Sequence, residues 1–233
     1  YAYTGTAPLD LSLRQNVERV LGVVLHNGYG LTETSPTISR TLYAVGSNEV
    51  NIGTPIPGVE IKIVGSDGCE IMDGSPGELH VRGPNVMLGY FRQPELTEAV
   101  IDKDGYLNTG DIVSVNSKQE MVVQGRTKEL IIRSGFNVYP PEIEAALNTH
   151  PAVLNSAVVG RSIEGNEEIV AFVEPVPGCH IEIDTLFALL DEQLARYKKP
   201  QKIIVMSQLP VAPNGKIRKN DLKKYAEALP SFA

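Results

Sequence analysis

The sequence is poor in cysteine and has no long apolar run. Its two cysteines among 233 residues, Cys69 and Cys179, lie far apart without the spacing of metal ligands. This argues against a disulfide framework or a zinc site and favours a reducing, cytoplasmic setting. No run of about eighteen apolar residues occurs, so no integral membrane segment is expected. The start at Tyr1 has neither an initiator methionine nor a charged leader, and we expect the sequence to be a piece of a longer chain.

Positively charged residues are fewer than negatively charged ones. Lys and Arg number 21 against 28 Asp and Glu, which gives a formal net charge of −7. A surface of this sign argues against nucleic acid as a partner, although small anionic ligands can still bind at local sites. The length allows one large domain or two smaller ones, and we expect two.

Residues 1–50 are typical of an α/β layer. Apolar residues recur with a helical period between Leu9 and Leu21, and Gly22 follows them. A short buried strand is predicted at Val23 to Leu25, and a glycine-rich segment begins after it at Gly28. Ligands of α/β sheets bind near the carboxyl ends of strands, so this order predicts a binding site at Gly28.

Residues 51–127 have short apolar runs separated by Gly, Pro, Asp and Ser clusters, which predicts a small β-barrel or sheet. A helix is expected from Pro94 to about Ile101, followed by a turn at Asp104-Gly105. The predicted strands are Val59 to Val64, Gly77 to Val81, Ile112 to Val115 and Met121 to Val123.

Residues 128–233 alternate between helical and strand patterns, which predicts a separate small α+β domain. The predicted strands are Lys128 to Ile132, Ser156 to Val159, Ile169 to Glu174 and Gln201 to Met206. The predicted helices are Pro141 to Asn148, Asp184 to Tyr197 and Lys219 to Ala228. The expected fold class is therefore α/β and α+β, in three segments.

The segment Gly28 to Glu33 combines residues that suit a bound nucleotide. Its two glycines can take positive φ and approach a ligand closely. Tyr29 offers a flat ring, Thr32 a hydroxyl and Glu33 a carboxylate for a metal. Gly-x-Gly turns are common and most are structural, so this segment alone leaves both interpretations open.

Further motifs follow in order along the chain. They are Gly77-Glu78-Leu79, Gly89-Tyr90, Tyr106 to Asp111, Gly125 to Lys128, Ser134 to Glu144 and Pro213 to Ile217. Together with Gly28 to Glu33, this set resembles the adenylate-forming superfamily of acyl-CoA synthetases, peptide-synthetase adenylation domains and beetle luciferases. The resemblance spans almost the whole chain, and Ser134 to Glu144 is most similar to acyl-CoA synthetases of fatty or related acids.

This resemblance implies the C-terminal part of an enzyme that joins a carboxylic acid to ATP, releases pyrophosphate and transfers the acyl group to CoA. The chain would hold the end of a large α/β nucleotide-binding domain (1–50), a β-barrel subdomain (51–127) and a mobile C-terminal domain (128–233). ATP, Mg²⁺ and CoA would take part, with Mg²⁺ on Glu33. The nucleotide would contact Gly5, Thr6, Ala7, Pro8, Asn27, Gly28, Tyr29, Gly30, Leu31, Thr32, Asp111, Arg126 and Lys216.

The same resemblance implies roles within the nucleotide site. Tyr29 would stack on adenine, and Thr32 would act on the phosphate. Asp111 would accept hydrogen bonds from both ribose hydroxyls, and Arg126 would be the matching donor. The structural alternatives are a turn-forming Asp after Gly110 and a surface Arg.

Lys216 is the expected catalyst of adenylation, projected by a type I′ turn at Asn214-Gly215. Lys128 matches the hinge at which the small domain rotates between two half-reactions. After rotation, the CoA channel on the opposite face would be lined by Ser134, Gly135 and Phe136. The structural alternatives are a solvated hairpin Lys, a strand-edge Lys and a loop that precedes a helix.

Two departures from the family pattern bear on function. The Ser/Thr/Gly-rich phosphate loop that ends in Pro-Lys-Gly does not occur, so this chain alone is not expected to turn over ATP. A Lys that luciferases and coumarate ligases carry near Ile132 is also missing, which favours a fatty-acyl-like acid. Three functions stay open: an acyl-CoA synthetase, an acyl-adenylating enzyme that loads a carrier protein, and a non-catalytic nucleotide-binding module.

Overall fold

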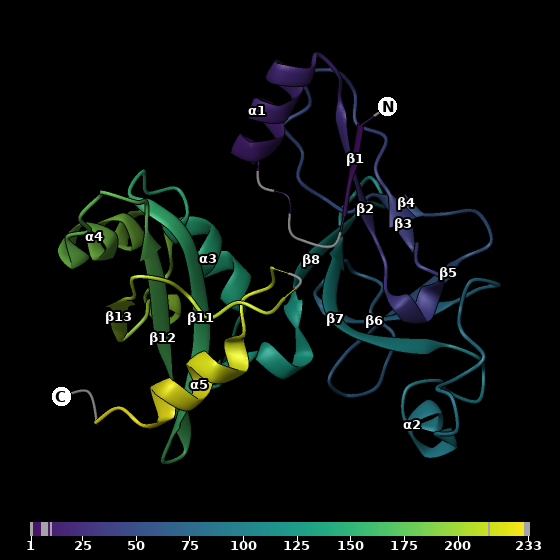
Figure 1. Cartoon of the computed structure of the whole chain (residues 1–233). Helices are drawn as coiled ribbons and strands as arrows, with labels where there is room; N and C mark the ends of the chain where they lie inside the picture. Colours follow the sequence, from purple (N-terminus) through teal and green to yellow (C-terminus); the bar gives the residue numbers. More distant parts are fainter. Residues whose placement is uncertain (1, 6–8, 10, 214, 231–233) are drawn as a thin grey trace. The chain divides into compact units, whose positions relative to one another are not determined.

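The computed structural model describes residues 2–5, 9, 11–213 and 215–230. The chain forms two compact units, Tyr1–Thr127 and Lys128–Ala233. Each unit has its own sheets and hydrophobic core (Figure 1). None of the helices in the described part of the chain has the length and apolarity needed to span a bilayer.

The first sheet of the N-terminal unit has the strand order β1-β2-β3-β4. Its strands are β1 (Ala2–Thr4), β2 (Leu25–Tyr29), β3 (Ser39–Arg40) and β4 (Thr54–Pro55), and the helices between them are α1 (Leu11–Leu21) and the 3₁₀ helix η1 (Thr32–Thr34). Strands β1 and β2 are parallel, whereas β3 is antiparallel to both of its neighbours. The α/β layer expected from the sequence is confirmed.

Strand β2 differs from the expectation in its position. It begins at Leu25 rather than at Val23, which is exposed, and it continues to Tyr29. The polar residue Asn27 is buried within it because its side-chain amide donates a hydrogen bond to the Asn51 carbonyl oxygen (3.1 Å). A buried polar group in a strand is stable when it has such a partner.

The glycines at 28 and 30 differ from the prediction in their backbone conformation. Among the described residues, neither is found at positive φ, so the expected turn geometry is wrong. Gly30 provides space instead, because a Cβ there would lie 1.7 Å from the Pro36 carbonyl oxygen. A Cβ on Gly28 would first meet the Tyr3 ring, at 3.0 Å.

The second sheet of this unit is antiparallel and open, in the order β5-β6-β7-β8. Its strands are β5 (Glu60–Val64), β6 (Gly77–Arg82), β7 (Leu107–Val115) and β8 (Met121–Arg126). The predicted barrel is therefore wrong, since β5 and β8 are not paired with each other in the described residues. Four strands are too few to enclose a packed barrel interior. Ile38 and Ile52 cover the inner face instead and pack with Leu79 and Val81.

Several further elements differ in length from the prediction. The helix predicted from Asp184 to Tyr197, for example, ends at Gln193. Helix α2 spans Pro94–Glu98 and stops short of Ile101, which forms a β-bridge with Leu107. The strand predicted from Lys128 begins only at Ile131, because Thr127–Glu129 forms the 3₁₀ helix η2.

The C-terminal unit has a two-stranded sheet, β9 (Ile131–Arg133) with β10 (Phe136–Val138), and a three-stranded sheet in the order β11-β12-β13. The larger sheet comprises β11 (Val153–Ile163), β12 (Asn166–Pro175) and β13 (Lys202–Val205). Its helices are α3 (Pro140–Leu147), α4 (Ile183–Gln193), the 3₁₀ helix η3 (Arg196–Lys198) and α5 (Lys219–Glu227). Strand β12 is antiparallel to β11 and parallel to β13, which confirms an α+β unit.

Two apolar cores cover the two faces of the larger sheet. Ala157 and Val159 of β11 pack with Leu222 of α5, whereas Val158 packs with Ile143 of α3 and with α4. This alternation follows from the two-residue period of a strand. Helix α5 therefore lies on one face, and α3 and α4 lie on the other (Figure 1).

Candidate functional site

Tyr29, Asp111 and Arg126, which come from three different strands, form one cluster that is linked by a hydrogen bond and an ion pair. The Tyr29 hydroxyl donates a hydrogen bond to Asp111 Oδ2 (2.5 Å), and Arg126 Nε lies 3.0 Å from Asp111 Oδ1. Asp111 is only 4% exposed, whereas the Arg126 side chain is 57% exposed. The structure thus brings together three residues that the resemblance assigns to one nucleotide site.

The backbone around Asp111 is held by Thr109. Its hydroxyl donates to the Leu79 carbonyl oxygen (2.8 Å) and accepts from the Asp111 N–H (3.1 Å). Gly110 between them has a φ of 70°, which glycine adopts without strain. Asp111 is the register partner of Arg126 on β8, which places both side chains on the same face of the sheet.

The cluster leaves Asp111 able to accept further hydrogen bonds. An ionised carboxylate offers about four acceptor sites, and Tyr29 and Arg126 occupy only part of them. Burial, and then the negative charge of Asp111, raise the pKa of Tyr29 well above its usual value, so its hydroxyl stays protonated even at an alkaline pH where a free tyrosine ionises. A ligand with two neighbouring hydroxyls matches the remaining acceptor sites.

Glu33 lies in η1 beside the exposed Thr32. Its Oε1 accepts a hydrogen bond from the Tyr90 hydroxyl (2.9 Å), and its carbonyl oxygen accepts one from the Met87 N–H (2.8 Å). No group of three or more His, Cys, Asp or Glu side chains is placed to hold a metal ion in the described residues. One carboxylate still fits Mg²⁺, because phosphates and water supply its other ligands in nucleotide sites.

The predicted segment that begins at Gly5 is only partly described. Thr4 pairs with Asn27, and a Cβ on Gly5 would lie 3.1 Å from the Gly28 carbonyl oxygen. Leu31 packs against the core of the second sheet, so its side chain has a structural role. The remaining predicted residues lie outside the described part of the chain: Thr6, Ala7 and Pro8.

Lys216 of the C-terminal unit lies in an exposed hairpin closed by the β-bridge between Val211 and Ile217. The Ala212 N–H donates to the Lys216 carbonyl oxygen (2.8 Å), and Gly215 has a φ of 80°. Asn214 of the predicted turn is not among the described residues. Ile217 packs against the core formed with α5, which places this hairpin on the α5 face of the sheet.

Ser134 to Phe136 connects β9 to β10. The Ser134 N–H donates to Asn166 Oδ1 (2.7 Å). Phe136 is 53% exposed and stacks on Tyr197 with their ring centroids 4.6 Å apart. Tyr197 packs against the core formed with α3 and α4, so this segment and the Lys216 hairpin lie on opposite faces of the sheet.

Comparison with known families agrees with this arrangement. The AMP-binding enzyme model matches residues 1–91, and the model of the AMP-binding enzyme C-terminal domain matches residues 142–216. The chain belongs to the AMP-binding enzyme family. Its open sheets and α/β and α+β units are those of an adenylate-forming enzyme.

Curated relatives of this chain are acyl-CoA ligases. The long-chain-fatty-acid–CoA ligase of Escherichia coli O157:H7 is 36% identical over 222 residues, which cover 95% of this chain and 39% of the relative. The 4-coumarate–CoA ligase 5 of Oryza sativa subsp. japonica is 39% identical over 236 residues, with coverage of 98% and 44%. The chain thus spans about two fifths of the length of the curated relatives it matches.

Solved structures of adenylate-forming enzymes share the fold. ATP-bound MatB from Rhodopseudomonas palustris has a TM-score of 0.88 at 33% identity, covering 97% of this chain and 45% of that one. The o-succinylbenzoate CoA synthetase MenE from Bacillus subtilis, in complex with the acyl-adenylate OSB-AMP, has a TM-score of 0.86 at 32% identity, with coverage of 95% and 45%.

Three side chains without a role in the sequence-based prediction contact a candidate residue or a residue next to one. Glu78 accepts a hydrogen bond from Thr127, Tyr90 donates one to Glu33, and Lys219 pairs with Glu129. Glu78 and Tyr90 occur in motifs that support the family resemblance, and those motifs could have indicated a functional role for both residues. Lys219 had none, since a Lys at the start of a helix is unremarkable by itself.

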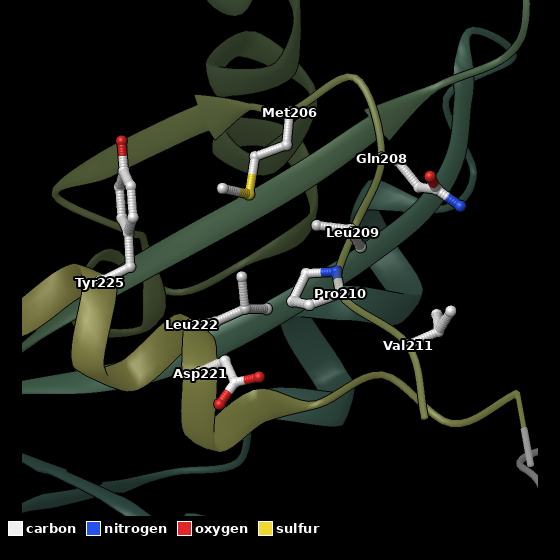
Figure 2. A pocket seen from close by; sticks show the side chains of 8 residues that line it. All are labelled: Met206, Gln208, Leu209, Pro210, Val211, Asp221, Leu222 and Tyr225. Carbon is white, nitrogen blue, oxygen red and sulfur yellow. The ribbon is translucent and has the colours of Figure 1, made fainter. Parts of the chain in front are cut away.

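A surface pocket of about 440 Å³ lies between the segment after β13 and helix α5. Figure 2 shows that Met206, Leu209, Leu222 and Tyr225 surround it, with Asp221 at one side. Its lining also includes Val211, the first residue of the Lys216 hairpin bridge. The pocket contains none of the predicted site residues.

Proposed function

We propose that this chain carries the ribose-binding carboxylate, the hinge and the mobile lysine of an ATP-dependent acyl-CoA synthetase. The observation that carries the proposal is the buried Asp111, which is held by Tyr29 and Arg126 and retains free acceptor sites. In this proposal Asp111 binds both ribose hydroxyls, Arg126 adds a donor at the rim, and Tyr29 offers its ring to adenine.

The phosphate side of the nucleotide would be bound next to η1. Thr32 would donate to a phosphate oxygen, and Glu33 would hold Mg²⁺, which when bound neutralises phosphate charge. The Tyr90 hydroxyl orients the Glu33 carboxylate through its hydrogen bond at 2.9 Å. Gly5, Gly28 and Gly30 would allow close approach of the ligand to the backbone.

The C-terminal unit would serve two half-reactions through its two faces. The exposed hairpin presents Lys216, whose ammonium would stabilise the charge that develops during adenylation. The segment Ser134, Gly135 and Phe136 on the other face would line the path of CoA. Lys128 would be the residue at which the unit rotates between these steps.

The acid is proposed to be a fatty or related carboxylic acid, and the thiol to be CoA. Relatives named as long-chain fatty-acid and 4-coumarate ligases match at similar identity, 36% and 39%. The absence of a Ser/Thr/Gly-rich phosphate loop from the sequence supports the proposal that this chain alone does not turn over ATP. Cys69 and Cys179 are free exposed thiols, which is compatible with a cytoplasmic enzyme.

The ribose contact has a direct binding test. The protein is titrated with ATP and with 2′,3′-dideoxy-ATP, and the ratio of the two dissociation constants is compared between the native chain, Asp111→Asn and Asp73→Asn. We expect a preference for ATP of about tenfold or more in the native chain and in Asp73→Asn, and its loss in Asp111→Asn, since two hydrogen bonds to a charged acceptor are removed. An equal ratio in all three proteins would contradict the role of Asp111.

The overall function is tested in the complete enzyme with a panel of carboxylic acids and pyrophosphate release as the readout. An acyl-CoA synthetase forms acyl-CoA from free CoA, whereas a carrier-loading enzyme requires a phosphopantetheinylated protein. The Lys216→Ala variant is expected to lose adenylation. Unchanged adenylation in Lys216→Ala would favour a non-catalytic role for this chain, and pyrophosphate exchange by the 233-residue chain alone would contradict the proposed need for the phosphate loop.

A further inference from the structure

The chain on either side of Lys128 is attached to a different unit. Lys128 is the first residue of the C-terminal unit and is exposed. No described residue forms a hydrogen bond or ion pair with its side chain. Its two neighbours, Thr127 and Glu129, both have side-chain partners.

Thr127 is attached to the N-terminal unit by Glu78. Its hydroxyl donates to Glu78 Oε1 (2.7 Å), and Asn108 donates from its side-chain amide to Glu78 Oε2 (2.9 Å). Asn108 Oδ1 in turn accepts from the Gly110 N–H (2.8 Å), next to Asp111. Glu78 therefore ties the last residue before Lys128 to the turn that positions the proposed ribose carboxylate.

Glu129 is attached to the C-terminal unit by Lys219. Lys219 Nζ lies 2.7 Å from Glu129 Oε2 and 2.8 Å from Glu144 Oε1 on α3. Glu144 Oε1 also accepts from the Val158 N–H of β11 (2.7 Å). Burial alone would lower the pKa of Lys219, but the carboxylates of Glu144 and Glu129 raise it above its usual value, so the ammonium is charged at neutral pH.

Lys219 also fixes the base of the hairpin that carries Lys216. It is the first residue of α5 and follows Lys216 closely in sequence. Its N–H donates to the Ile217 carbonyl oxygen (3.1 Å), and the neighbouring Arg218 N–H donates to the Pro210 carbonyl oxygen (2.8 Å). Lys219 thus connects the residue after Lys128 with helix α3 through its side chain, and it contacts the end of the hairpin through its backbone.

We propose that Glu78 and Lys219 are positioning residues that clamp the chain on the two sides of Lys128. The backbone change between the half-reactions is then confined to Lys128, and the C-terminal unit carries the Lys216 hairpin with it as a rigid body. The inference rests on the proposed function of Lys128 and Lys216. It adds the Glu78 clamp (Glu78 with Thr127) and the Lys219 clamp (Lys219 with Glu129 and Glu144).

The first test measures the clamp without reference to activity. Trypsin cleavage after Lys128 is followed by mass spectrometry in the native protein, Lys219→Met and Arg218→Met. Arg218→Met is the matched control, because it removes an adjacent, exposed positive charge whose partner is the partly buried Asp221 (2.8 Å). We expect cleavage to be about tenfold faster in Lys219→Met and unchanged in Arg218→Met, since local opening exposes the bond. An equal rate in all three proteins overturns the Lys219 clamp. Cleavage of Glu78→Gln is measured in the same way, and a rate equal to that of the native protein overturns the Glu78 clamp.

The second test measures positioning in the complete enzyme. Lys219→Met is expected to lower kcat for adenylation at least about tenfold while KM for ATP changes less than about twofold, because Lys216 is misplaced and the substrate site is not. Acyl transfer to CoA from a preformed acyl-adenylate, which does not use Lys216, is expected to change less. Lys219→Arg keeps the positive charge, so it is expected to retain the ion pairs and most of the adenylation activity.

A further variant guards against a simple folding defect. Glu129→Gln removes the contact next to Lys128 but leaves the Lys219 pair with Glu144 at 2.8 Å, so it should keep its melting temperature and still lose adenylation kcat. Normal kcat in both Glu129→Gln and Lys219→Met overturns the positioning role. Failure of the native complete enzyme to adenylate any acid would instead overturn the proposed function, and the cleavage rates would still decide whether the clamps exist.

Discussion

Tyr29 combines a buried hydroxyl with a ring at the end of β2. The hydroxyl donates to Asp111 at 2.5 Å, and the raised pKa of Tyr29 keeps it a donor at neutral pH. Arg126 approaches the other oxygen of the same carboxylate from the exposed side. The buried carboxylate is therefore held by one hydrogen bond and one ion pair before any ligand arrives.

Removal of the Tyr29 hydroxyl is expected to change how the free energy of unfolding depends on pH in the alkaline range. In the unfolded chain a tyrosine ionises near pH 10, whereas Tyr29 in the folded protein stays protonated beyond that point. The free energy of unfolding should therefore fall above pH 10, by up to about 1.4 kcal/mol per pH unit from this group. Tyr29→Phe lacks this contribution, and the effects of the other tyrosines cancel in the comparison.

The measurement is urea unfolding of the native protein and Tyr29→Phe between pH 9 and pH 11. Below pH 10 the variant should be less stable by about 1 kcal/mol because Asp111 loses a donor. The difference should shrink as the pH rises. A difference that stays constant through this range would contradict the raised pKa of Tyr29.

Strand β2 ends at a point where two parts of the backbone nearly touch. Gly30→Ala would place a Cβ 1.7 Å from the Pro36 carbonyl oxygen, and a backbone group has little freedom to move away. We expect a loss of about 2–3 kcal/mol in the free energy of unfolding. Gly28→Ala is the control, since its nearest contact is the exposed Tyr3 side chain, at 3.0 Å, rather than a backbone group. Equal losses in both variants, measured by urea unfolding, would contradict this reading of Gly30.

The sequence predicted most elements by type and missed those that depend on distant partners. The helices at Pro140–Leu147 and Lys219–Glu227 lie within one residue of the predicted ends, because their periodicity and caps are local signals. Strand β2 was misplaced because Asn27 is polar, and its partner Asn51 is remote in sequence. The order of apolar and polar residues identifies the buried face of a sheet but not the residues that cover it. The sequence therefore could not distinguish a barrel from the open sheet that forms.

The candidate site was predictable as a set of residues and not as a geometry. Motif order placed Tyr29, Asp111 and Arg126 in one proposed site, yet nothing in the sequence indicated that the first two share a hydrogen bond. The sequence did not predict a role for Lys219, because its proposed role depends on contacts with Glu129 and Glu144 that form only in the folded unit.

The whole molecule consists of two units joined at Thr127 and Lys128. The C-terminal unit has cores on both faces of its sheet, so residues 128–233 are expected to fold alone. A cooperative urea transition and dispersed amide resonances of the 128–233 fragment would verify this. A disordered fragment would show that its cores need the N-terminal unit.

A rotation at the junction predicts an unequal effect of Lys128→Pro. Proline fixes φ near −65° and removes the N–H, so it can satisfy at most one of two backbone states. In the complete enzyme we expect one half-reaction to lose about tenfold more rate than the other. The two rates are measured separately as pyrophosphate release and acyl transfer, and equal losses in both would argue against a hinge at this residue.

The strand β11 separates two cores by a single alternation, with Val158 on one side and Ala157 and Val159 on the other. Inserting or deleting one residue within Val153–Ile163 would send each following side chain to the opposite core. Many of the affected positions could still accept another apolar residue. In a library of variants, this strand should therefore tolerate exchanges between apolar residues and reject changes of length.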